Sequence, residues 1–294
     1  MFGTMMNSSE ALKKLQSVEL EILRVVDAFC REHDIQYFID GGTALGAARH
    51  RGFIPWDDDI DIGMLREDYE LFCSLALTGL PEGYSLHTAR NSEGYPALFA
   101  KVYKDGTLFV NEEALQSGSN MGIFIDVFPY DRLYQETSLR NKQIRNASLS
   151  QKRSYLYYLS TITVPHKGFL GSLERISCRL MHRIERLMVS DPSVYQDFFD
   201  RSVPSSDIGD ISDSCLTLVW PNMSPISISD VFPLASLSFE GECFPVPRNI
   251  DFYLTNMYGD WRVLPPREDR HTHLPLSLDF GDGSVWNIGS QDEC

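Results

Sequence analysis

The residues best suited to chemistry lie in the run Trp56-Asp57-Asp58-Asp59-Ile60-Asp61. Because side chains two apart in a strand point to the same face, Asp59 and Asp61 project together, and Asp57 joins them if the strand begins early. Two carboxylates held this closely repel each other, and burial adds to the cost of their charge. A divalent cation with oxygen ligands would neutralise them, so the spacing predicts a metal site. The alternatives are protonation and a solvated acidic turn.

A second motif, Gly41-Gly42-Thr43, lies where an apolar strand gives way to an Ala-rich helix. Glycines at such a turn let backbone amides approach a phosphate at the N-terminus of the helix. A phosphate cradle beside a carboxylate pair is typical of a phosphoryl-transfer site. The two motifs together therefore favour a functional site over a structural acidic turn.

Asp126 interrupts an otherwise apolar run, residues 123–128, whose composition is typical of a buried strand. A charged side chain inside such a strand requires a charge partner. The alternative is a buried Asp that caps a local backbone amide.

The run DGGTALGAARHRGFIPWDDDID, residues 40–61, resembles the signature of the LicD family. Two further segments fit: GIFIDVFPYD at 122–131, and YGDW at 258–261 followed by LPP at 264–266, Arg270 and His273. LicD proteins are bacterial phosphocholine transferases, similar to the fukutin and fukutin-related proteins that transfer ribitol phosphate. The resemblance covers residues 37–280. It implies an α+β fold with a nucleotidyltransferase-like mixed β-sheet core flanked by helices, and a CDP-activated alcohol donor.

The resemblance also implies roles for the acidic residues. Asp59 and Asp61 would be ligands of Mg²⁺ or Mn²⁺, and Asp126 would be the third carboxylate, so these three are the catalytic candidates. Asp57 would either bind the metal or, like Trp56, orient neighbouring residues without contacting the metal. One of the carboxylates would take the proton of the acceptor hydroxyl.

Positive charge and backbone amides must complement the donor's diphosphate. The donor-binding candidates are Gly41, Gly42, Thr43, Arg49, Lys101, Arg270 and His273. Each cation taken alone is an ordinary surface charge. Within the family pattern, Arg49 and Arg270 favour a phosphate role, whereas Lys101 and His273 fit either interpretation.

The first functional interpretation is a metal-dependent phosphotransferase. It would move phosphocholine, or a similar alcohol phosphate, to a hydroxyl of a cell-surface glycan or its lipid-linked precursor. The alternatives are a nucleotidyltransferase that transfers NMP from an NTP, and a catalytically inactive binding module. Choline would require an aromatic cage around its ammonium group, for which Trp56 and Trp261 are candidates.

The elements that position these residues follow from the hydrophobic periodicity. Helices are expected at 9–33, 44–50, 67–77 and 249–258, and strands at 35–39, 60–64, 84–87, 98–103, 107–110 and 122–128. A turn at residues 104–106 predicts a hairpin between the strands 98–103 and 107–110. A second hairpin is expected around residues 239–243, and the polar stretch 190–214 is expected to be a loop or a poorly ordered connection.

Charge divides the chain into three parts: a catalytic core at 1–133, a basic helical segment at 134–190, and a C-terminal part at 191–294 that completes the cleft. The middle segment holds ten Lys and Arg against three Asp and Glu, so it carries +7 while the remainder carries -22. It is expected to be helical with a break at 163–165. It is either a solvated face or a peripheral contact for an anionic bilayer or a lipid-linked acceptor.

The overall composition limits the class of protein. With 43% hydrophobic and 23% charged residues, the chain is expected to fold, and a net charge of -15 argues against a nucleic-acid partner. Because the sequence shows no apolar run of spanning length, no membrane-spanning helix is expected, and a signal peptide is not expected either. Six dispersed cysteines predict reduced thiols. A cytoplasmic protein is expected, with the inner face of the membrane as an optional contact.

Overall fold

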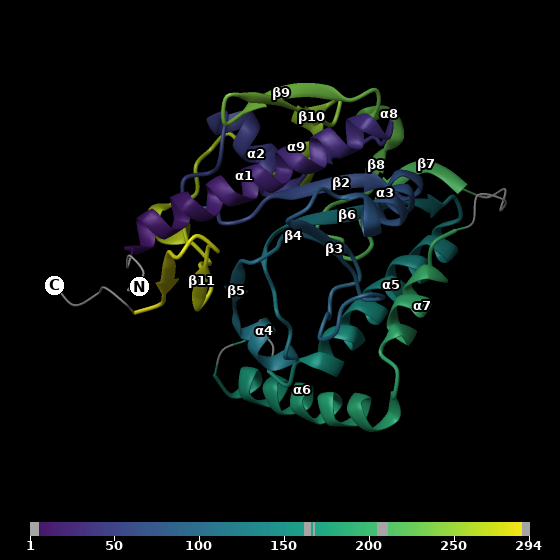
Figure 1. Cartoon of the computed structure of the whole chain (residues 1–294). Coiled ribbons are helices and arrows are strands. Elements are labelled where there is room, and N and C mark those ends of the chain that lie inside the picture. The colour runs from purple at the N-terminus through teal and green to yellow at the C-terminus, as the bar shows by residue number, and fades with distance from the viewer. Residues whose placement is uncertain (1–5, 162–165, 167, 205–210, 290–294) are drawn as a thin grey trace.

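The computed structural model describes residues 6–161, 166, 168–204 and 211–289. The helices are α1 (Ser8–Glu32), α2 (Gly41–His50), α3 (Arg66–Gly79), α4 (Glu112–Ser117), α5 (Thr137–Tyr158), α6 (Gly168–Met188), α7 (Ser193–Asp200), α8 (Ile228–Val231), α9 (Ile250–Tyr258) and the short η1 (Arg267–Asp269). The strands are β1 (Phe38–Ile39), β2 (Asp61–Leu65), β3 (Tyr84–His87), β4 (Ala100–Lys104), β5 (Leu108–Val110), β6 (Ile123–Tyr134), β7 (Ile211–Leu216), β8 (Ile226–Ser227), β9 (Ala235–Phe239), β10 (Glu242–Val246), β11 (Ser277–Asp279) and β12 (Val285–Asn287). The expected α+β architecture is confirmed (Figure 1).

The main sheet has the strand order β1-β2-β6-β4-β3, and β7 extends it by pairing with the far end of β6. Strands β2 and β6 are parallel, with Asp61 opposite Asp126. Strands β4 and β6 are antiparallel, with Lys101 opposite Asp126. Because paired residues on neighbouring strands point to the same face, this register places three charged side chains in one row.

Helix α1 is an amphipathic helix that covers the sheet. Asn7 and Glu10 form a capping box at its start. Its inward face includes Leu15, Ile22 and Val26, all fully buried, which contribute about 1.5–3 kcal/mol each by leaving water. The helix expected at 9–33 is thus confirmed.

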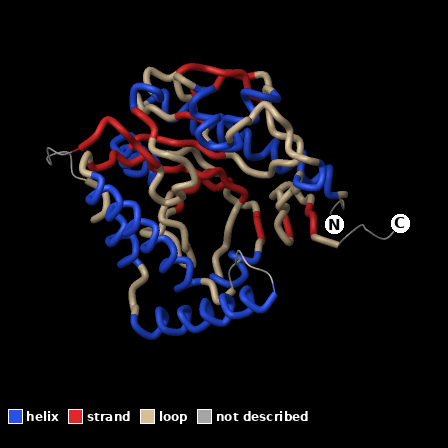
Figure 2. Tube along the Cα trace, turned by 180° about the vertical axis from the view of Figure 1, so that it is seen from behind, coloured by secondary structure: helices blue, strands red, loops and turns tan. Residues whose placement is uncertain are grey.

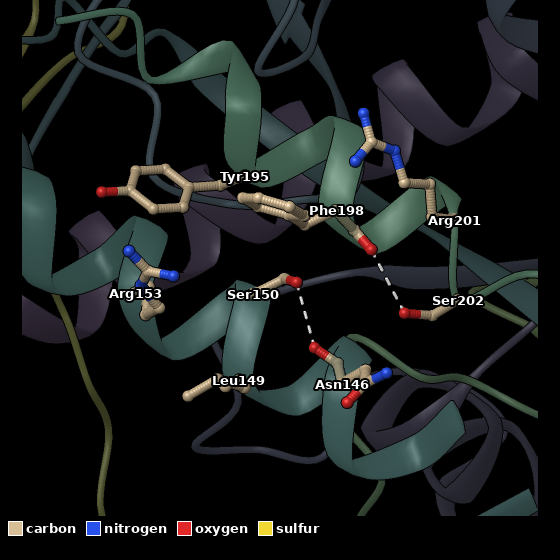
Figure 3. Close-up of a pocket in the computed structure, with 8 residues that line it drawn as sticks. All are labelled: Asn146, Leu149, Ser150, Arg153, Tyr195, Phe198, Arg201 and Ser202. Carbon is tan, nitrogen blue, oxygen red and sulfur yellow. Dashed lines mark hydrogen bonds between the residues drawn. The ribbon is translucent and has the colours of Figure 1, made fainter. Parts of the chain in front are cut away.

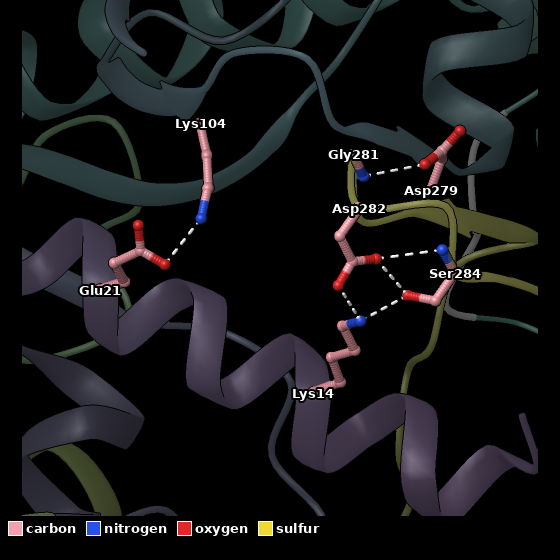
Figure 4. Close-up of polar contacts among 7 residues, drawn as sticks. All are labelled: Lys14, Glu21, Lys104, Asp279, Gly281, Asp282 and Ser284. Carbon is pink, nitrogen blue, oxygen red and sulfur yellow. Dashed lines mark hydrogen bonds and ion pairs between the residues drawn. The ribbon is translucent and has the colours of Figure 1, made fainter. Parts of the chain in front are cut away.

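Figure 4 shows two of the ion pairs that attach α1 to distant parts of the chain. Glu21 Oε2 lies 2.6 Å from Lys104 Nζ at the end of β4, and Lys14 Nζ lies 2.5 Å from Asp282 Oδ2 in the β11–β12 turn. Lys14 also donates to the Ser284 hydroxyl. Surface pairs of this kind contribute at most about 1 kcal/mol each, so they position α1 more than they stabilise it.

The stretch 190–214, expected to be a loop or a poorly ordered connection, contains regular structure at 193–200 and 211–214, so that prediction is wrong there; residues 205–210 lie outside the described residues. Helix α7 packs against α5, and strand β7 begins at Ile211. Tyr195 and Phe199, one turn apart, are fully buried at the α7 contact. The burial of these two aromatic side chains on one helical face favours a helix more strongly than the flanking Ser, Asp and Pro residues favour a loop. The break expected at 163–165 lies outside the described residues.

The hairpin expected between residues 98–103 and 107–110 does not form. The chain turns at Gly106, but β5 leaves the main sheet and pairs with β11, with Phe109 opposite Leu278. Both side chains are buried there, which accounts for the longer-range pairing. The hairpin expected around residues 239–243 is confirmed as β9–β10.

The basic segment forms two long helices, α5 and α6. Seen from behind, α5, α6 and α7 lie together on the side of the molecule away from the β9–β10 hairpin (Figure 2). Strand β6 runs on to Tyr134, and β7 and β11 add strands from beyond residue 190 to the sheets of the N-terminal part. In the described part of the chain, no helix combines the length and apolar character that crossing a membrane requires.

Candidate active site

The centre of the candidate site is the charged row on β2, β6 and β4. Lys101 Nζ donates to Asp126 Oδ1 across 2.6 Å, and the two side chains are 8% and 16% exposed. The ammonium group also lies 3.5 Å from the centre of the Phe124 ring. Burial raises the pKa of Asp126, and Lys101 opposes that rise. Lys101 is therefore the charge partner that a buried Asp in this strand requires.

Asp59 and Asp61 add negative charge beside this pair. Enclosure by the protein, followed by the charges of Asp58 and Asp126, raises the pKa of Asp59 to about 6, although its side chain remains exposed. Burial, followed by the charges of Asp59 and Asp126, raises the pKa of Asp61 well above its usual value. The cluster thus favours either protonation or a bound cation.

The two glycines of the second motif make room for carboxylates. A side-chain carbon at Gly42 would lie 2.8 Å from Asp57 Oδ2, and one at Gly41 would lie 3.1 Å from Asp61 Oδ2. Gly41 also has a φ of +49°, which favours glycine, and its amide donates to Asp40 Oδ1. The glycines therefore bring the N-terminus of α2 against the acidic cluster, and their role toward a phosphate stays a prediction.

Thr43 joins the helix to the strand. Its side chain is buried, and its hydroxyl accepts a 2.9 Å hydrogen bond from the Asp61 amide. The Asp61 carbonyl in turn accepts from the Asp40 amide at 2.9 Å. These bonds fix where the Asp61 carboxylate emerges from the start of β2.

Asp57 lies beside the cluster and partly under the influence of Arg49. Burial, followed by the charges of Asp59 and Asp58, raises the pKa of Asp57 to about 8, and Arg49 opposes this rise. Asp57 is therefore close enough to the other carboxylates to share their charge balance.

Asp40 is a site residue that the sequence analysis missed. It is 3% exposed, caps α2, and accepts hydrogen bonds from the hydroxyls of Tyr130 on β6 and Tyr253 on α9. Burial raises its pKa. An Asp immediately before a glycine-rich helix start is a common N-cap signal and could have indicated this role.

Glu19 on α1 was also missed. It is 2% exposed, and its Oε2 has no hydrogen-bond partner in the described part of the protein. Burial, then the charges of Asp59 and Asp58, raises its pKa well above the usual value. The signal was present in the sequence, because Glu19 lies between Leu15 and Ile22 on the apolar face of the helix.

Asp59, Asp61 and Asp126 line a common cavity of about 290 Å³, together with Tyr155, Trp220 and other residues. A larger cavity of about 1000 Å³ lies against α4, α5 and α6. Tyr155 and Trp220 line both cavities, so the two are adjacent. Trp220 is 60% exposed, which leaves its ring available to a ligand.

The predicted arginines form a separate group. Arg270 lies over Trp56, with its Cζ 5.1 Å from the ring centre, and Arg49 Nη1 donates to the Trp261 carbonyl at 3.0 Å. Burial and the charge of Arg270 lower the pKa of Arg49, so the two guanidinium groups are close neighbours. Neither lines the 290 Å³ cavity.

The two tryptophans proposed for a choline cage already have cationic neighbours. Arg270 lies over Trp56, and Arg262 lies over Trp261 with its Cζ 4.4 Å from the ring centre. Neither tryptophan lines the cavity of the three carboxylates, whose aromatic lining residues are Phe99, Phe128, Tyr130, Tyr155, Trp220 and Tyr258.

His273 contacts the acidic loop through its backbone. Its amide donates to Asp58 Oδ1 at 3.2 Å, while its side chain is exposed. The chain segment after η1 is thereby attached next to Asp59.

A third cavity, of about 300 Å³, lies between α5 and α7, where Figure 3 shows the Ser150 hydroxyl directed to the Asn146 carbonyl and Phe198 on the neighbouring helix. Two arginines line it. Arg153 donates to Glu185 of α6 at 2.8 Å, and the Tyr195 hydroxyl donates to the same carboxylate at 2.7 Å. Arg201 lies over the Phe198 ring, with its Cζ 5.4 Å from the ring centre. These contacts join α5, α6 and α7, and they account for the charged groups of this cavity structurally.

The fit of a metal ion depends on the chemistry of the donors. Carboxylate oxygens from Asp59, Asp61 and Asp126 are the ligands that Mg²⁺ and Mn²⁺ prefer, and neighbouring carboxylates, Asp126 among them, help to raise the pKa of Asp59 and Asp61. As the side chains stand, however, the described residues contain no complete group of three or more such ligands. The donor set thus suits a hard cation, and the metal stays a prediction.

Residues 34–167 match the family model described as "LicD/FKTN/FKRP, nucleotidyltransferase domain". The chain is 28% identical over 270 residues to the lipopolysaccharide cholinephosphotransferase LicD of Haemophilus influenzae, which covers 89% of this chain and 95% of that protein. It is 44% identical over 48 residues to the human ribitol 5-phosphate transferase FKRP, which covers 16% of this chain and 10% of FKRP. The resemblance expected from the sequence is confirmed.

Proposed function

We propose that the protein is a metal-dependent phosphotransferase acting on a glycan, because residues 34–167 match the model of the LicD/FKTN/FKRP nucleotidyltransferase domain and the chain is 28% identical over 270 residues to a lipopolysaccharide cholinephosphotransferase. It moves phosphocholine, or a similar alcohol phosphate, from a CDP-linked donor to a hydroxyl of a cell-surface glycan or its lipid-linked precursor. The observation that carries the proposal is the convergence of Asp59, Asp61 and Asp126 on one cavity.

The reaction follows from the groups around that cavity. The acceptor hydroxyl oxygen attacks the phosphorus that bears the alcohol, the bond from this phosphorus to the CMP oxygen breaks, and CMP leaves. Asp59 is exposed, whereas Asp61 and Asp126 are partly buried, so Asp59 is the carboxylate best placed to take the hydroxyl proton. When bound by Asp59, Asp61 and Asp126, Mg²⁺ or Mn²⁺ would offset the diphosphate charge.

Lys101 has a supporting role in this mechanism. Its ammonium group bonds Asp126 and opposes the rise in the pKa of Asp59. It therefore keeps carboxylates ionised, as ligands and a proton acceptor must be. A direct contact between Lys101 and the donor is not needed for this role.

The second candidate is a nucleotidyltransferase, because the family model itself describes a nucleotidyltransferase domain. The two reactions use the same groups and differ in the phosphorus attacked. Incubation with CDP-choline and lipopolysaccharide, and separately with CTP, distinguishes them: the phosphotransferase releases CMP, whereas the nucleotidyltransferase releases pyrophosphate. Pyrophosphate from CTP without CMP from CDP-choline would refute the proposal. Neither product, together with ligand binding, would indicate an inactive binding module.

The identity of the alcohol can be tested by ligand-induced stabilisation. A ligand that binds the folded state raises the melting temperature by mass action, so CDP-choline, CDP-ribitol and CDP-glycerol can be compared with and without Mg²⁺. We expect the largest shift with CDP-choline. Trp220→Ala should reduce this shift more than the shift with CDP-glycerol, because only choline offers a cation to an aromatic face.

A further inference from the structure

Helix α6 carries an apolar stripe that the rest of the described chain leaves uncovered. The helix lies at the edge of the molecule (Figure 1). Leu173, Ile176 and Leu180 are 52%, 60% and 58% exposed, and Leu187 is 86% exposed. Amphipathic helices of water-soluble proteins normally turn such a stripe toward the core. This stripe therefore calls for a partner outside the described chain.

The other side of α6 is attached to α5. Glu185 is buried and bonded to Arg153, and His182 Nδ1 lies 2.9 Å from the Leu156 carbonyl. At about 100° per residue, Glu185 and His182 fall on the side of the helix opposite the stripe. The orientation of α6 is thus fixed by polar contacts, and it directs the leucines outward.

A strip of arginines lies between these two sides. Arg175, Arg179, Arg183 and Arg186 recur at spacings of four, four and three, which places them along one side of the apolar stripe. Arg179 and Arg183 are exposed. Segment 134–190 carries +7 and the remainder carries -22, so an anionic surface would attract this part of the molecule and repel the rest.

Charge also distinguishes between the occupants that an exposed apolar stripe could have. A symmetric contact between two copies would use the same patch on both, and would bring the two arginine strips toward a shared rim. A bilayer with anionic headgroups instead offers an apolar layer and negative phosphates side by side, which matches the order of leucines and arginines.

We infer that α6 is an interfacial helix that binds the surface of an anionic lipid bilayer. Leu173, Ile176 and Leu180 enter the boundary with the acyl chains, and the arginines contact headgroup phosphates. One interpretation of the sequence is a membrane contact for the whole basic segment, residues 134–190. The structure restricts this contact to α6, because α5 packs against α6, α7 and β6. This binding goes beyond the proposed phosphotransfer, which needs no membrane.

The location of α6 gives the binding a consequence for the site, which rests on the proposed function. Arg175 of α6 lines the 1000 Å³ cavity, which shares Tyr155 and Trp220 with the carboxylate cavity. A molecule seated on α6 would hold this cavity close to the headgroups. A phosphate-bearing, lipid-linked acceptor could then approach the carboxylates while its lipid stays in the bilayer.

Co-sedimentation of the full chain with vesicles tests the inference. The protein should bind vesicles of phosphatidylglycerol and phosphatidylcholine at low ionic strength, and bind less at high ionic strength or to phosphatidylcholine alone. Arg179→Gln with Arg183→Gln should weaken binding about 30-fold, which corresponds to ~2 kcal/mol. Lys13→Gln with Arg248→Gln removes the same charge from exposed positions elsewhere and should have little effect.

A matched pair of leucines tests the apolar contact. Leu180→Gln should weaken vesicle binding several-fold, whereas Leu77→Gln on α3 should not, although Leu180 and Leu77 are 58% and 56% exposed. No binding of the parent protein at low ionic strength, or equal losses from the two leucine variants, would overturn the inference. A dimer in light scattering that Leu180→Gln dissolves, without vesicle binding, would assign α6 to self-association instead.

A second readout separates this inference from the proposed function. CMP release with a lipid-free acceptor should be the same in the Arg179→Gln/Arg183→Gln variant and the parent protein. If the parent protein binds vesicles but releases no CMP, the proposed function fails and the inference about α6 stands. If it releases CMP but binds no vesicles, only the inference about α6 fails.

Discussion

Replacing Lys101 by Met tests whether one ammonium group keeps the acidic cluster compatible with folding. Met conserves much of the side-chain length and can retain the contact with Phe124, so the main change is the loss of charge. The substitution leaves the largely buried Asp126 carboxylate beside Asp59 and Asp61 without its ion pair. Removing one partner of a buried pair costs about 3–5 kcal/mol. Because Asp126 is 16% exposed, we expect the lower end, about 3 kcal/mol at neutral pH.

The cost should depend on pH with a definite sign. The folded-state pKa of Asp126 is already raised from 3.8, and it should rise further without Lys101. A carboxyl with a raised folded-state pKa loses stability as pH increases from its unfolded pKa toward its folded pKa. Below that window the carboxyl is protonated in both states. The Lys101→Met variant should therefore be close to the parent protein in mild acid and fall away from it toward neutral pH.

Urea unfolding of four proteins measures the effect: the parent, Lys101→Met, Asp126→Asn and the double variant, each at about pH 5 and about pH 7.5. The double variant should recover a large part of the loss, giving a coupling free energy of about 2 kcal/mol. Lys104→Met is the control, because its pair with Glu21 has the same 2.6 Å separation but is more exposed, and should cost less than about 1 kcal/mol. The reasoning would be refuted if the losses in unfolding free energy of Lys101→Met and Asp126→Asn simply added in the double variant. It would also be refuted if Lys101→Met lost the same unfolding free energy at both pH values.

Three further substitutions test other parts of the site. Asp61→Asn should abolish CMP release while leaving urea stability equal or higher, because it removes one of the repelling charges; near-normal turnover at saturating Mg²⁺ would contradict the metal role. Glu19→Gln should raise the melting temperature at neutral pH but hardly at pH 4, since the raised pKa of Glu19 makes its ionised form unfavourable in the folded state; an equal gain at both pH values would refute this. Gly46→Ala should destabilise the protein by about 1–3 kcal/mol in urea, despite the better helix propensity of Ala, because its added carbon would lie 2.5 Å from the Gly52 carbonyl; a gain in stability would show that the loop can move away.

Most local structure could be predicted from the sequence, because it depends on neighbours along the chain. The apolar spacing of α1, the alternation in β3 and the glycine that ends α9 are visible without any tertiary contact. The same holds for part of the chemistry. Asp59 and Asp61 project together because of the two-residue period of extended backbone, and both do line one cavity.

Local composition predicted the wrong structure where burial against distant segments favoured a different one. Residues 193–200 form a helix because Tyr195 and Phe199 are buried against α5, and no local signal reveals that contact. Strand β5 pairs with β11, more than 160 residues away, although a turn next to β4 favoured the nearer partner.

The sequence alone determined which residues carry charge, which of them share a face, and where glycines allow close approach. Only the tertiary structure decided which residues become the ion-pair, hydrogen-bond and charge neighbours of the site carboxylates. Sheet register places Lys101 opposite Asp126, packing of α9 against α2 supplies the Tyr253 hydroxyl to Asp40, and α1 adds Glu19 to the acidic cluster. These partners come from distant segments, and burial and register depend on how the whole core packs. For that reason the charge balance of the site could not be derived from spacing along the chain.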